Sequence, residues 1–128
     1  MPMRLGGRAR IVFAAATAAL AVCAGIAWAH QFIARSHVTI EYVGHFNGKV
    51  SSKHASCERR RNVTVRRVVA GPDPSYGSDR TDASGSWTVD ASADVEGLYY
   101  AQASFKRIRK SGHDHVCLAA RSDEIFIG

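Results

Sequence analysis

The stretch Thr81-Asp82-Ala83-Ser84-Gly85-Ser86-Trp87 decides the fold of this 128-residue chain. Asp82 to Gly85 is a strong turn signal, because an aspartate side chain accepts hydrogen bonds from nearby backbone and glycine readily takes a positive φ. Trp87 and Val89 then alternate with polar residues, which is typical of a strand with one buried face. The stretch therefore predicts a tight turn that leads into a β-strand.

Alternation with a period of two recurs along the chain, and no long helical period follows residue 30. Val38, Ile40 and Tyr42, for example, would share one face of a strand. The proline-containing segment 71–75 reads as a loop, because proline cannot donate to a strand ladder. The expected strands lie near residues 38–42, 46–50, 62–70, 87–89, 98–108, 116–120 and 125–127. About seven short strands with regular turn signals predict an all-β fold, a β-sandwich.

Three motifs resemble those of prealbumin-like modules, which include transthyretin-like and carboxypeptidase-regulatory-like domains. The stretch 81–87 resembles their T-D-x-x-G-x-aromatic turn. Gly97-Leu98-Tyr99-Tyr100-Ala101 is similar to the strand that follows, and Phe46-Asn47-Gly48-Lys49-Val50 to the opening strand. The resemblance covers roughly residues 37–127. It implies a seven-stranded antiparallel Greek-key sandwich that is usually secreted and usually not catalytic.

The N-terminus has the parts of a secretory signal peptide, which would form a helix before the sandwich. Arg4, Arg8 and Arg10 precede an uncharged run over residues 11–29 that ends in Ala27-Trp28-Ala29. Cleavage after Ala29 would place the domain outside the cytoplasm, in the cell envelope or the medium. The alanine- and arginine-rich composition is typical of a bacterial exported protein.

Two other interpretations of this segment stay open. The run 11–29 is close to the length of a membrane-spanning helix, although its many alanines make it a weak anchor. Cys23 could instead be the lipidated residue of a lipoprotein. In each case we expect a signal or anchor over residues 1–29, a linker over 30–36 and a β-sandwich domain over 37–128.

The cysteine count agrees with export. Once Cys23 leaves with a signal peptide, Cys57 and Cys117 remain as a pair 60 positions apart. In an oxidising compartment such a pair most simply forms a disulfide. The alternative is a reactive or metal-binding thiol pair, but no C-x-x-C spacing supports it.

Basic residues gather in two places that could form one surface for an acidic protein, an acidic polymer or an anionic membrane. An exported protein rarely meets nucleic acid, which argues against that partner. The alternative is that these residues only protect sheet edges from strand-to-strand pairing. The candidate surface residues are Arg59, Arg60, Arg61, Arg66, Arg107, Arg109 and Lys110.

Histidines offer the main alternative function. On a strand His113 and His115 would point the same way, so their imidazoles could share a metal with His45 or His54. A solvated turn beside Gly112 is the simpler interpretation, and we expect no metal and no cofactor.

The sequence predicts a binding or structural module rather than an enzyme. It has no G-x-S-x-G motif. The Tyr-Arg-Gly-Ser ending of the enzymatic transthyretin-like branch is absent as well. A small exported hydrolase that uses the histidines, or a metal-binding protein, is the alternative.

Overall fold

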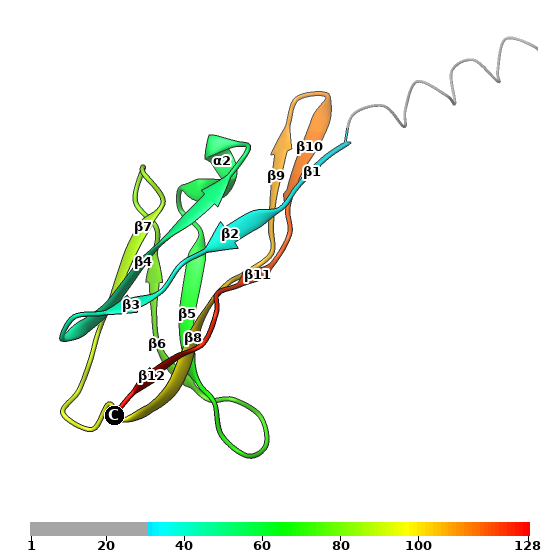
Figure 1. Cartoon of the computed structure of the whole chain (residues 1–128). Helices are drawn as coiled ribbons and strands as arrows, with labels where there is room; N and C mark the ends of the chain where they lie inside the picture. The colour runs from blue at the N-terminus through cyan, green and yellow to red at the C-terminus, as the bar shows by residue number, and fades with distance from the viewer. Residues whose placement is uncertain (1–30) are drawn as a thin grey trace, which may run out of the picture. The chain divides into compact units, whose positions relative to one another are not determined.

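The computed structural model describes residues 31–128, which form mainly antiparallel β-structure with one short helix (Figure 1). The predicted signal peptide, the alternative anchor and the lipidated Cys23 lie outside the described residues. Within the described part, no helix is long and apolar enough to cross a membrane. The expected all-β class is confirmed.

One large sheet is built around β8 (Gly97–Ala103), whose two neighbours are β5 (Asn62–Arg67) and the C-terminal strands. Valines alternate with polar residues along β5, so one face of this sheet is buried and the other is solvated. The remaining strands of this sheet are β6 (Ser75–Arg80), β11 (Ala120–Arg121) and β12 (Ile125–Ile127).

A second sheet is built around β4 (His45–Ser52). This strand pairs with β7 (Ser86–Asp90) over residues 45–49, and with two short N-terminal strands over residues 46–47 and 50–52. The short strands are β2 (Ser36–Val38) and β3 (Glu41–Tyr42).

The two larger sheets share one core, an arrangement consistent with a β-sandwich. Phe46 of β4 and Tyr99 of β8 come from different sheets, and their ring centroids lie 4.9 Å apart. Trp87 of β7 is buried against the same core. The other buried members are Val38, Val50, Val63, Val65, Val89, Val95, Ala101 and Ala103.

The predicted turn before β7 is confirmed. The Asp82 carboxylate accepts hydrogen bonds from the backbone N–H of Ser84 at 2.9 Å and of Ser86 at 3.0 Å. These bonds lower the pKa of the Asp82 side chain. Gly85 has a φ of 85°, which favours glycine. The turn thus sets where β7 begins and which of its faces enters the core.

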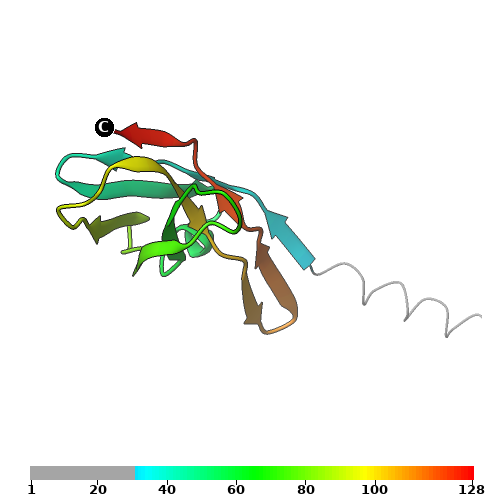
Figure 2. The same ribbon diagram turned by 90° about the horizontal axis from the view of Figure 1, so that it is seen from below.

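A smaller third sheet has the order β1 (Gln31–Ala34), β10 (His113–Cys117), β9 (Lys106–Lys110). Figure 2 shows the β9–β10 hairpin, in orange and brown, projecting from the two larger sheets. The predicted linker over 30–36 is therefore wrong for residues 31–34, which form β1, and for Ser36, which begins β2. The sequence did not predict β1 because a four-residue strand is too short to show an alternating pattern.

The predicted strand over 98–108 is broken in two. The chain leaves the large sheet after Ala103, and β9 begins at Lys106 as part of the small sheet. Twelve strands therefore replace the expected seven in the described residues. Most of the added strands are short pieces on either side of such a break.

The predicted disulfide is present. Cys57 lies in α2 (Ala55–Glu58), a helix that the sequence did not predict, and bonds to Cys117 at the end of β10 with a Cα–Cα distance of 5.6 Å. Both cysteines are fully buried, in a small apolar cluster with Ala34 and Ile108. The bond therefore fixes the small sheet to α2. It also fits an oxidising, extracytoplasmic environment.

We expect the double variant Cys57→Ala/Cys117→Ala to lose about 2–5 kcal/mol of unfolding free energy, because the bond closes a 60-residue loop. Urea denaturation followed by circular dichroism would measure the loss. An unchanged denaturation midpoint would contradict a structural role for the bond.

Candidate anion-binding site

Arg61 belongs to the predicted basic surface, but it is fully buried, so that prediction is wrong for this residue. It directly precedes β5, and its backbone N–H donates to the hydroxyl of Thr81 at 2.7 Å. The run of three arginines therefore does not form one solvated face. Its third member points inward.

Neutral oxygen atoms surround the Arg61 guanidinium. It donates to the carbonyl of Ser104 from both Nε, at 3.1 Å, and a terminal nitrogen, at 2.8 Å. It also donates to the carbonyls of Leu118 at 3.0 Å and Cys57 at 2.9 Å, and to the Ser36 hydroxyl at 2.9 Å. Burial lowers the Arg61 pKa, but an arginine side chain stays charged in proteins. A buried positive charge is thus held by carbonyl dipoles without a carboxylate partner among the described residues.

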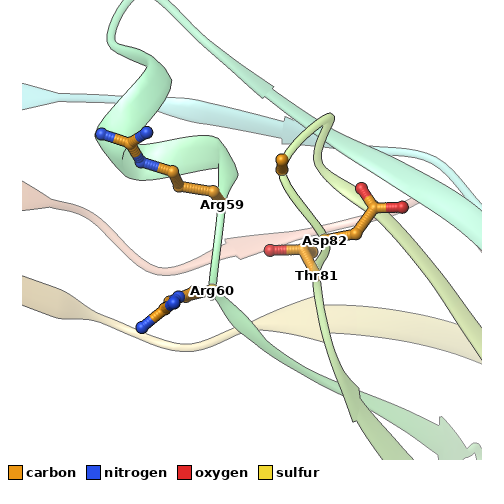
Figure 3. Close-up of a pocket in the computed structure, with 5 residues that line it drawn as sticks. Arg59, Arg60, Thr81 and Asp82 are labelled. Atoms are coloured by element: carbon orange, nitrogen blue, oxygen red, sulfur yellow. The ribbon is translucent and has the colours of Figure 1, made fainter.

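Arg59 and Arg60 are exposed, in contrast to their neighbour. They line a hollow of about 490 Å³ together with Thr81, Asp82 and Ala83. Figure 3 shows both guanidinium groups extending to one side of this hollow, while the Asp82 carboxylate points away from them. Within residues 31–128, neither arginine forms an ion pair.

The backbone holds Arg60 in place. Its φ is 52°, a left-handed conformation that is uncommon for a residue with a side chain. Its N–H donates to the carbonyl of Thr81 at 3.0 Å, directly beside the buried Arg61. The two exposed arginines therefore stand on a fixed turn, which limits the entropy that a ligand would have to remove on binding.

Lys106 extends this positive region. Its Nζ donates to the carbonyls of Arg59 at 2.9 Å and Ser56 at 3.1 Å, so the start of β9 lies against the end of α2. Burial, followed by repulsion from nearby arginines, lowers the pKa of Lys106. Those arginines are Arg61, Arg59, Arg60 and Arg80.

The hairpin carries its basic residues on two opposite faces. Lys106, Ile108 and Lys110 alternate with Arg107 and Arg109 along β9. Ile108 packs in the apolar cluster around the disulfide, which places Lys106 and Lys110 on the face toward α2. We call Arg59, Arg60, Lys106 and Lys110 the basic surface.

Three other predicted members of the surface lie elsewhere. Arg107 and Arg109 occupy the far face of the hairpin, where Arg107 lies 3.6 Å from the Asp114 carboxylate. Arg66 lies on β5, and its guanidinium donates to the Gln102 side chain at 3.0 Å and to the Asp73 carbonyl at 3.1 Å. The prediction that these residues form one surface with Arg59 and Arg60 is therefore wrong.

Three histidines gather on the α2 side of the hairpin. The His115 ring lies 5.0 Å from that of His113 and 5.6 Å from that of His54, measured between centroids. Phe32 of β1 packs on the rings of His113, at 5.7 Å, and His115, at 5.3 Å. We call His54, His113 and His115 the histidine cluster. The expectation that His113 and His115 point the same way is confirmed.

His45 does not join this cluster. It pairs with Asp90 at the first residue of β4, whereas His54 follows the other end of that strand. Across residues 31–128, no group of three or more potential ligands is arranged to hold a metal ion. The His115 ring packs against the rings of His54, His113 and Phe32.

The His115 side chain resists protonation. Burial is the main cause of its lowered pKa, followed by repulsion from His113, Lys110 and His54. Its Nδ1 atom is buried and has no hydrogen-bond partner within the described structure. The neutral imidazole is therefore the form that suits this packing.

Comparison with protein families, curated proteins and solved structures found no match to this chain.

We expect Arg61→Met to lower the unfolding free energy by about 3–5 kcal/mol, because it removes a buried cation and leaves several buried carbonyls unsatisfied. Arg59→Met removes the same charge from an exposed position and should change stability by no more than about 0.5 kcal/mol. Urea denaturation of both variants would measure the difference. Equal stabilities would contradict the role assigned to Arg61.

We expect thermal stability to fall as the pH drops below 6.5, the ordinary pKa of histidine. The unfolded chain takes up a proton at His115 near that pH, and the folded chain only at lower pH. The contribution of His115 to stability is therefore fully present above pH 6.5. It is lost as the pH falls from 6.5 towards the lowered pKa of His115 in the folded protein. Melting temperatures at pH 7.5 and 5.5 would test this, and His115→Gln should reduce the difference between them. A variant with the same pH dependence as the wild type would contradict the assignment.

Proposed function

We propose that this protein is an extracytoplasmic, non-catalytic β-sandwich module that binds a linear anionic polymer through the basic surface. The observation that carries this proposal is the pair Arg59 and Arg60, two exposed guanidiniums on a fixed turn with no ion-pair partner in residues 31–128. Export would follow from the N-terminal sequence and fits the disulfide.

The arrangement of the charges favours an extended partner over a small ion. Arg59 and Arg60 follow α2, Lys106 touches the end of α2, and Lys110 lies four residues further along β9. At about 3.3 Å per residue, Lys106 and Lys110 are separated by about 13 Å along the strand. A chain of regularly spaced anionic groups can contact such a series of cations at several points at once.

We further propose that the domain is a prealbumin-like module, on the basis of the sequence resemblance. This resemblance supplies the Greek-key arrangement, the secreted location and the non-catalytic role. The shared core of the two larger sheets and the confirmed Asp82 turn are compatible with it.

A hydrolase or a metal-binding protein remains the alternative, and the histidine cluster is the feature that would support it. Alternation along β10 places the Asp114 carboxylate on the face opposite His113 and His115, where it lies near Arg107. The nearest acidic residue in sequence is thus directed away from the imidazoles. The geometry therefore favours a binding role over acid–base chemistry.

Binding of the purified protein to dextran sulfate, measured by isothermal titration calorimetry at low salt, would test the proposal. We expect Arg59→Gln/Arg60→Gly to weaken binding about tenfold or more, because two exposed cations are lost. Glycine suits the positive φ at position 60, so the variant should fold normally.

Arg107→Gln/Arg109→Gln is the matched control, since it removes two exposed charges from the far face of the hairpin and should change the affinity less than twofold. Equal weakening by both variants would show that only net charge matters and would contradict the proposed surface. Binding to phosphatidylglycerol vesicles without binding to dextran sulfate would overturn the choice of a polymer in favour of a membrane.

A further inference from the structure

The histidine cluster lies beside the basic surface. His54 directly precedes α2 and its ring touches that of His115, while Arg59 directly follows α2 and its carbonyl binds Lys106. The short helix α2 thus connects the histidine cluster, at its N-terminus, to the basic surface, at its C-terminus. In Figure 1, α2 and the β9–β10 hairpin lie at the same end of the domain.

The β9–β10 hairpin also places the histidine cluster next to the basic surface. Lys110 is the residue opposite His113 in the β9–β10 ladder, and Ile108 is opposite His115. Residues directly opposite each other on paired strands share a face. Lys106 and Lys110 of the basic surface therefore stand on the same side of the sheet as His113 and His115.

The groups that face the cluster are basic, aromatic or apolar. They are Lys110 from β9, Phe32 from β1, and Ile108 and the disulfide beneath them. Asp114 lies on the other face with Arg107, and the Glu58 carboxylate of α2 accepts a hydrogen bond from the backbone of Ser52 at 3.0 Å. No ion pair in the described part of the chain offsets the charge that the imidazoles gain when they protonate.

We propose that the histidine cluster regulates the basic surface, so that the protein binds its anionic polymer more tightly at mildly acidic pH than at neutral pH. This inference rests on the proposed function. Acidification would add positive charge next to Lys110 and so lengthen the series of cations that begins at Arg59.

The direction follows from thermodynamic linkage. In the free protein, burial and repulsion among like charges lower the His115 pKa. A bound polyanion would offset this repulsion and make protonation easier. Because linkage is reciprocal, protonation must strengthen polymer binding by the same factor that the polymer strengthens protonation. The repulsion that adds to burial in lowering the His115 pKa is therefore relieved when an anionic ligand binds.

Dextran sulfate is the suitable probe, because its sulfate groups stay ionised at both pH values. Affinity would be measured by calorimetry at pH 7.5 and 5.5 at equal ionic strength, with melting curves to confirm that the protein is folded. We expect wild type to bind about tenfold more tightly at pH 5.5, which corresponds to about 1.4 kcal/mol. The variant His54→Gln/His113→Gln/His115→Gln should lose this response and keep the affinity at pH 7.5.

His37→Gln/His45→Gln is the matched control. These histidines lie on β2 and β4, outside the cluster, so the variant should keep the full pH response. If the triple variant does not fold, the single variant His113→Gln should still reduce the response by at least half.

The outcomes separate the two proposals. If wild type binds dextran sulfate equally well at both pH values, the inference fails and the proposed function stands. If wild type binds at neither pH, the proposed function fails and the inference with it. A full pH response in the folded triple variant would overturn the assignment to these histidines.

Discussion

The guanidinium group of Arg61 holds together segments that are far apart in the sequence. It donates hydrogen bonds to the carbonyls of Cys57, Ser104 and Leu118. Ser104 follows β8 and Leu118 follows β10, so both carbonyls belong to residues where the chain passes between the large and small sheets. A buried cation without a carboxylate would be costly, and these dipoles offset that cost only in the native arrangement. The junction of the sheets therefore depends on one side chain.

The disulfide fixes the same junction by a different means. Cys57, whose carbonyl binds Arg61, is covalently linked to Cys117, the residue before Leu118. The covalent bond limits how far the unfolded chain can separate these segments, while the hydrogen bonds select one native geometry for them. The β9–β10 hairpin has little apolar surface of its own to bury, and it gains a fixed position from this combination.

The sequence predicted the features that depend on near neighbours. The Asp82 turn needs only residues 82–86, and strand alternation needs only a few positions. The burial of Arg61 could not be predicted, because the partners of its side chain include residues 43 and 57 positions away and a run of arginines looks like a solvated surface. The gathering of His54 with His115 has the same origin, since it needs the disulfide and α2 to bring distant segments together.

The inward position of Arg61 also explains why Arg59 and Arg60 are exposed to solvent. The backbone before β5 must turn so that Arg61 enters the core, and Arg60 takes a left-handed conformation within that turn. Arg59 and Arg60 are thereby held outward beside Lys106, although their charges repel one another. Such crowding opposes folding by a small amount, because exposed charges are screened by solvent. A ligand of opposite charge removes this cost when it binds, so positive side chains carried on a fixed backbone turn favour an anionic partner.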